Sequence, residues 1–243
     1  MEGATDTFIN VTGNSKPAMK SFITISATLL LFILFSCRQK KEDKSFIVFN
    51  EGVTLNLKSI SEQEKGNFES ASKLNKQSID KFKETLKIDS SHPGARISLG
   101  HALYVDGQFE EAISWFNQAN KVDGTTAINL REMGLCKINL GHINEGKSDI
   151  DKAFSIDTKK EIKEITIQDL VDIGDLAFSY GDGYIKQGEV DKGKDYKIFS
   201  IEVLRLAFGY DSTKKENALK IVEYADKFGD KLTSNKYKLL AGR

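Results

Sequence analysis

The chain has 243 residues, of which 40% are hydrophobic and 29% are charged, enough for a buried core and for one or two domains. Lysine plus arginine and aspartate plus glutamate are equal at 35 each, so the net charge does not indicate nucleic acid binding, which needs a basic excess on some face. The two cysteines, Cys37 and Cys136, form neither a disulfide framework nor a Cys-x-x-Cys metal site. We therefore expect no nucleic acid partner, no metal and no cofactor.

The first part of the chain is typical of a targeting signal. Ser21–Phe35 is an apolar run behind Lys20, shorter than the ~20 residues of a membrane span and suited to a signal-peptide core. The end of this run and the two residues that follow it read Leu34-Phe35-Ser36-Cys37, which resembles the lipobox of bacterial lipoproteins. The resemblance implies a signal peptide over residues 19–36 and acyl chains, such as palmitate, on Cys37, where several chains give a stable membrane anchor. The alternative is a signal anchor that is never cleaved.

The residues on either side of this signal carry further expectations. A polar leader of residues 1–18 does not fit a signal peptide, so the true start is either Met1 or Met19. Arg38 is not the aspartate that retains lipoproteins at the inner membrane in some bacteria, and the resemblance therefore favours the outer membrane. We expect a protein of the cell envelope, lipid-anchored and facing the periplasm. Residues 37–58 are expected to be a tether, with a β-prone stretch, Ser45–Leu57, that docks as an extended segment.

The strongest pattern is a repeat with a period of 34 residues. When Gly100 is aligned with Gly134, small and apolar residues return in phase, and a fixed period of this length marks a helical solenoid. Solenoids bind along extended surfaces. The pairs in phase are Gly107 with Gly141, Phe109 with Ile143, Glu111 with Glu145, Ala112 with Gly146, Phe116 with Ile150, Ala119 with Ala153, and Asp123 with Asp157.

Residues 93–126 and 127–160 resemble the tetratricopeptide repeat, a helix–turn–helix unit of this length. The resemblance implies an all-α fold: a right-handed superhelical array of three to four such units followed by C-terminal capping helices. In it, small residues lie where the two helices of a unit cross, and a glycine with positive φ makes the turn. The residues expected to make this packing are Gly100, Gly107, Ala112, Phe116, Ala119, Gly134, Gly141, Gly146 and Ala153.

The ends of the array are less regular. The preceding unit admits two registers, one that fits Ser78–Asp89 to the second helix and one that matches Gly66–Ala71 to Gly107–Ala112 and lengthens that helix by about two turns. Both registers stay open. We expect the repeats to span residues 59–160.

Beyond Lys160 the register slips, with an insert or a helix extension at residues 161–169. Gly181 to Gly188 then repeats the step from Gly100 to Gly107. We expect residues 161–243 to form degenerate repeat-like helices and a polar cap, because the last unit of a solenoid has no neighbour to cover it.

Tetratricopeptide arrays line their concave face with the first helix of each unit. By that resemblance, the residues expected in the groove are Ile97, His101, Tyr104, Val105, Arg131, Leu135, Ile138 and Asn139, followed by Phe178, Asp182 and Ile185. This mixed, largely aliphatic set predicts that the groove accepts an extended or helical segment of a partner protein. The alternative is that Ile97, Leu135 and Ile138 only pack against neighbouring helices. The lysine and asparagine clamp of chaperone-binding repeats is missing, since Ile97, His101 and Glu132 occupy its places.

No catalytic motif is found in the sequence: neither Gly-x-Ser-x-Gly, nor a Walker loop, nor His-Glu-x-x-His. We therefore expect a protein that is not an enzyme but a membrane-anchored interaction module of the bacterial cell envelope, with other proteins as partners. Two alternatives are a self-associating structural solenoid and an accessory lipoprotein of an envelope assembly or secretion complex. Capture of a ligand such as a glycan or a small peptide is a third, and an enzyme built on the loops between repeats is a fourth.

Overall fold

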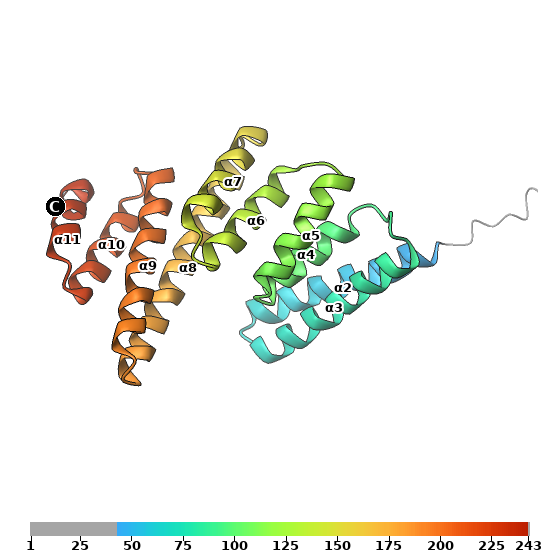
Figure 1. Ribbon diagram of the computed structural model, residues 1–243, viewed down its shortest axis with the longest axis horizontal. Coiled ribbons are helices and arrows are strands. Elements are labelled where there is room, and N and C mark those ends of the chain that lie inside the picture. Colours follow the sequence, from blue (N-terminus) through green and yellow to red (C-terminus); the bar gives the residue numbers. More distant parts are fainter. Residues whose placement is uncertain (1–42, 243) are drawn as a thin grey trace, which may run out of the picture. The chain divides into compact units, whose positions relative to one another are not determined.

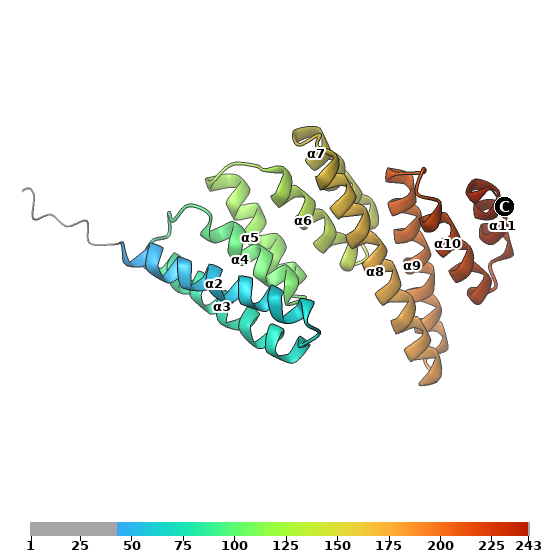
Figure 2. The same cartoon turned by 180° about the vertical axis from the view of Figure 1, so that it is seen from behind.

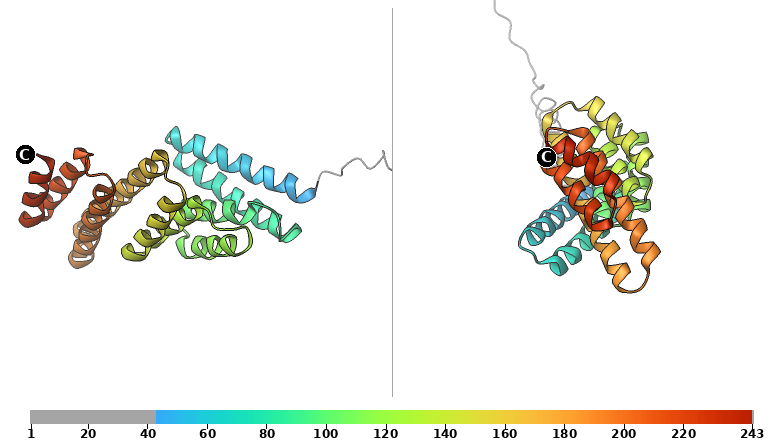
Figure 3. Two further views of the ribbon diagram at one scale, coloured as in Figure 1. Left: turned by 90° about the horizontal axis from the view of Figure 1, so that it is seen from above. Right: turned by 90° about the vertical axis from the view of Figure 1, so that its left-hand side faces the viewer.

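The computed structural model describes residues 43–242, and one compact unit begins at Ser45. Ten α-helices and no strand occur in this part of the chain, so the expected all-α class is confirmed. The helices pair in chain order into five hairpins (Figures 1, 2 and 3). They are α2 (Lys44–Glu64), α3 (Phe68–Ile88), α4 (Ala95–Val105), α5 (Phe109–Val122), α6 (Ala127–Asn139), α7 (Ile143–Ile156), α8 (Lys160–Lys186), α9 (Val190–Tyr210), α10 (Lys215–Phe228) and α11 (Lys231–Ala241).

The leader, the signal peptide and Cys37 lie outside the described residues. Within residues 43–242, no helix combines the length and the apolar character that a membrane crossing requires.

Four of the hairpins turn in the same way. Gly66, Gly107, Gly141 and Gly188 have φ values of 80°, 76°, 85° and 88°, a backbone conformation that glycine adopts without a steric cost. The amide that follows each glycine donates a hydrogen bond of 2.9 Å to the carbonyl five residues earlier, which closes the end of the first helix. The repeated glycine therefore fixes where each first helix stops.

The same four hairpins cross at paired small residues. Seven residues before each turn glycine lies one member of a pair, and the second member follows twelve residues later: Ser59 with Ala71, Gly100 with Ala112, Gly134 with Gly146, and Gly181 with Gly193. A Cβ atom on Gly134 would lie 2.7 Å from the carbonyl oxygen of Gly146, so neither glycine has room for a side chain. Gly100 instead makes room for the Phe116 ring, 2.7 Å from where a Cβ would be.

The first hairpin settles which of the two registers holds. The Ser59 hydroxyl donates a hydrogen bond of 2.7 Å to the carbonyl of Ala71, which places this pair at the crossing. Gly66 makes the turn, as in the second register, and α3 has 21 residues where α5 has 14. The longer second helix is thus present.

Residues 45–57 lie within α2, so the expected extended segment is wrong, and the repeats begin before residue 59. The buried residues of α2 are Ser45, Val48, Gly52 and Ser59, which recur at helical spacing. Gly52 packs against the Phe82 ring of α3, where a Cβ atom would come within 2.7 Å. This packing against α3 outweighs the β-propensity of the apolar residues.

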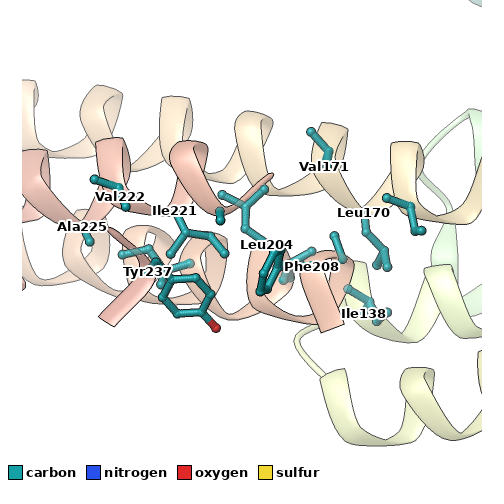
Figure 4. Packing of buried hydrophobic residues seen from close by; sticks show 14 of the residues in the cluster. Ile138, Leu170, Val171, Leu204, Phe208, Ile221, Val222, Ala225 and Tyr237 are labelled. Atoms are coloured by element: carbon teal, nitrogen blue, oxygen red, sulfur yellow. The ribbon is translucent and has the colours of Figure 1, made fainter. Parts of the chain in front are cut away.

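Buried side chains form two clusters along the array. The first joins Phe82, Leu99 and Phe116 across α3, α4 and α5. The second holds the C-terminal half together and includes Leu170 and Leu204, with side chains from α8, α9, α10 and α11 (Figure 4).

The hairpin of α8 and α9 is displaced along its axis relative to the regular repeat. Between α4 and α6, His101 pairs with Glu132, and each lies within two residues of its crossing glycine. Between α6 and α8, Arg131 hydrogen-bonds Thr166, which lies 15 residues before Gly181. The displacement amounts to about two helical turns. The slip of register after Lys160 is a helix extension, because α8 begins at Lys160 and has 27 residues.

Candidate binding hollows on the first-helix face

The first helices of the hairpins, α2, α4 and α6, enclose a hollow of about 330 Å³. We call it the aliphatic hollow. Leu57 and Ile128 on its rim are 62% and 58% exposed, although both are apolar. Its lining consists of Val53, Asn56, Leu57, Phe82, Ile97, Ser98, His101, Ile128 and Glu132.

A second hollow of about 460 Å³ lies between the α4–α5 turn, the end of α6, and the helices α8 and α9. We call it the aromatic hollow. The Tyr104 and Phe109 rings lie 6.1 Å apart, and Tyr180 meets Tyr196 edge to face at 6.0 Å, both measured between ring centroids. Its lining consists of Tyr104, Val105, Asp106, Gly107, Phe109, Asn139, Ile173, Leu176, Ala177, Tyr180, Tyr196 and Phe199.

The aromatic hollow exists because α8 and α9 are displaced. The α8–α9 hairpin extends past the α6–α7 turn (Figures 1 and 2), so α6 does not reach along the C-terminal half of α8, on the side away from α9. Leu176 and Tyr180 on that half are 52% and 51% exposed. In a regular repeat the preceding first helix would cover them.

Five of the eight residues expected in the groove line one of the hollows. Ile97 and His101 lie in the aliphatic hollow, and Tyr104, Val105 and Asn139 lie in the aromatic hollow. Burial raises the pKa of the Tyr104 phenol, so its hydroxyl stays protonated at neutral pH.

Three of the expected groove residues lie elsewhere. Leu135 and Ile138 are fully buried, so the expectation that they contact a partner is wrong. The close crossing of α6 and α7 is the reason, because Ile138 packs over Gly146, where a Cβ atom would be 2.5 Å from Ile138 Cγ1. Arg131 is buried as well and binds side chains of α8.

The residues expected to continue the groove on α8 do not line either hollow. Phe178 is buried and stacks on Tyr224, with 4.0 Å between the ring centroids. Asp182 pairs with Lys197 at 2.5 Å, and Ile185 packs over Gly193. The displacement of α8 moves these positions out of line with the groove residues of α4 and α6.

A chain of buried and half-buried charges connects α4, α6 and α8 at the boundary between the hollows. His101 Nδ1 lies 2.9 Å from Glu132 Oε1, and Arg131 Nε donates a hydrogen bond of 3.0 Å to Thr166 Oγ1. The Arg131 guanidinium also pairs with Asp169. Burial opposes the charge on His101, but the hydrogen bond to Glu132 and its negative charge outweigh burial and raise the histidine pKa. The network fixes how the three first helices lie beside one another.

Leu176, Tyr180, Tyr196 and Phe199 were not among the expected site residues. The signal that could have found them is the register slip after Lys160, because an extension of the first helix moves new residues opposite α6. The alignment of Gly181 with Gly134 selects Phe178, Asp182 and Ile185 instead.

Cys136 is buried on α6 at the place where the preceding unit has Ala102. Burial raises its pKa to about 12, so the reactive thiolate is scarce at neutral pH. We expect native protein to react with a thiol reagent at Cys136 only after unfolding, which timed labelling with and without urea would measure. Rapid labelling of the folded protein at this residue would contradict its buried position.

The fold defines a helical-repeat protein of the tetratricopeptide type. No protein-family model matches the chain, and no curated protein matches it. Among solved structures, MamA is similar with 19% identity and a TM-score of 0.39, over 75% of this chain and 91% of MamA. The S. pombe nuclear import adaptor Nro1 is similar with 8% identity and a TM-score of 0.42, over 82% of this chain and 92% of Nro1. Neither likeness carries a function over to this chain.

Proposed function

We propose that this protein is an interaction module that binds a segment of a partner protein along its first-helix face. The support is the pair of hollows, in which Leu57, Ile128, Leu176 and Tyr180 are each between 51% and 62% exposed. Apolar surface that is gathered in hollows and left open to water is typical of a binding site.

The two hollows are close enough for one segment to occupy both. His101 and Val105 lie one turn apart on α4, the first in the aliphatic hollow and the second in the aromatic hollow. On α6, Glu132 and Asn139 lie about two turns apart, or ~10 Å. A few extended residues or two turns of an amphipathic helix cover that length, so both common modes of peptide recognition fit.

Photo-crosslinking in cells tests this binding surface. A benzophenone amino acid in place of Leu57 or of Leu176 is expected to capture the same partner protein. The matched control replaces Ile156, which is 54% exposed on the second helix α7. Capture of that partner with equal yield from Ile156 would contradict the proposal, as would capture of nothing but a second copy of this chain, which would favour a self-associating solenoid.

We also propose that a lipid on Cys37 anchors the module to a bacterial membrane, with the domain in the periplasm and the outer membrane favoured. The support is the lipobox-like Leu34-Phe35-Ser36-Cys37 behind an apolar core.

Replacing Cys37 by serine is expected to abolish acylation. The protein is then either released into the soluble fraction or kept as the uncleaved precursor. Metabolic labelling with an alkyne fatty acid, followed by fractionation, measures both effects. Cys136→Ser is the matched control and should keep the label, because that thiol is buried in the repeats. Equal labelling of the Cys37→Ser protein and the native protein would rule out this anchor.

A further inference from the structure

The aromatic hollow differs from the aliphatic hollow in the number of aromatic side chains that line it. Tyr104, Phe109, Tyr180, Tyr196 and Phe199 all line it. A cation held over the faces of such rings is attracted by their negative π-faces, and arginine adds planar stacking to this attraction.

The aromatic hollow also carries negative charge without a cation to balance it. Asp106 lines it, and Asp195 lines an adjoining hollow of about 250 Å³ that shares Asn139, Tyr196 and Phe199 with it. The Asp106 carboxylate accepts a hydrogen bond of 2.7 Å from the neutral amide of Gln108. Among the described residues that line these two spaces, none is a lysine, an arginine or a histidine.

Two carboxylates of α8 have cations of their own. Asp175 pairs with Lys220 at 2.5 Å, and Asp182 pairs with Lys197 at 2.5 Å. In the aliphatic hollow, Glu132 already pairs with His101. Within residues 43–242, Asp106 and Asp195 form no such ion pair. No described residue that lines the aromatic hollow therefore supplies a cation to Asp106.

We propose that the aromatic hollow receives an arginine side chain of the partner segment, with its guanidinium among the tyrosine rings and beside Asp106. This inference rests on the proposed function and names the chemistry of the partner. The apolar residues that flank the arginine occupy the aliphatic hollow. The segment that binds is thus amphipathic and basic, and its affinity falls as salt screens the charge.

Selection from a library of short random peptides, displayed on phage and bound to the full-length protein in detergent, tests the proposal. We expect enrichment of peptides with an arginine beside apolar residues. A selected peptide is then synthesised in two forms, with arginine or with its neutral isostere citrulline. Citrulline is expected to weaken binding about tenfold.

Two protein variants locate the effect. Asp106→Asn is expected to reduce the difference in affinity between the arginine and citrulline peptides. Tyr180→Ala is expected to lower the affinity of the arginine peptide more than that of the citrulline peptide. Leu232→Ala on α11, where the side chain is 84% exposed, is the control and should leave both affinities unchanged.

The outcomes separate this inference from the proposed function. Equal binding of the two peptides, or the same difference between them in Asp106→Asn, would overturn the arginine site. If the same peptides still lost affinity for a Leu57→Glu variant, in which the aliphatic hollow is changed, the proposed function would stand without the arginine site. Peptides that depend on neither hollow, or no enrichment at all, would overturn both.

Discussion

Replacing Gly146 by valine is expected to lower the free energy of unfolding by about 3–5 kcal/mol. A Cβ atom at this position would lie 2.5 Å from Ile138 Cγ1 and would also meet the backbone carbonyl of Gly134 on the facing helix. A side-chain tip can move aside, but a helix backbone moves only if the hairpin of α6 and α7 opens. Urea unfolding followed by circular dichroism measures the loss.

The control for this variant is Gly183→Ala in α8. Apart from the local backbone of α8, no atom lies within 4 Å of the Cβ position there, and the residue is inside a helix, so alanine should raise stability by about 0.5–1 kcal/mol. An unfolding midpoint for Gly146→Val that equals the native one would mean that α6 and α7 do not cross at this glycine.

Replacing Arg131 by methionine is expected to lower the free energy of unfolding by about 3 kcal/mol, because it breaks a charge network that is largely buried. Asp169, whose side chain is 30% exposed, loses its ion-pair partner, and Glu132, whose side chain is 8% exposed, keeps only His101. Thr166 loses its partner as well. The loss is expected in the contact between α6 and α8, so hydrogen exchange should rise first there.

Arg205→Met on α9 is the matched control, since Arg205 is exposed and its removal should change stability by no more than about 0.5 kcal/mol. Equal effects of the two substitutions would show that the buried network does not hold α6 against α8.

The regular part of the fold follows from local rules that a sequence displays. Gly107 and Gly141 adopt positive φ and end the first helices, and Gly134 faces Gly146 at the crossing. Each of these features depends on the identity of one or two residues. The helix over Ser45–Leu57 was not predicted, because its stability comes from contacts with Phe82 and its neighbours on α3, not from its own propensities.

The repeat period alone does not show which first-helix residues are open to a partner. Ile97 and His101 line the aliphatic hollow, where α4 and α6 lie in regular register. Leu135 and Ile138 lie in an equally regular unit but are core residues in the cluster that joins α6 to α8. The displacement of α8, which creates the aromatic hollow, depends on tertiary contacts such as the one between Arg131 and Thr166, and the sequence shows only that the register slips after Lys160.

Titration of the purified crosslinked partner against Leu176→Lys and Leu232→Lys variants tests most directly whether the first-helix face is the binding surface. Both leucines are exposed, at 52% and 84%, so both variants should fold. We predict a loss of at least about tenfold for Leu176→Lys, which removes an apolar contact and places a positive charge in the aromatic hollow, and native affinity for Leu232→Lys. Equal affinities of the two variants would contradict the binding surface described.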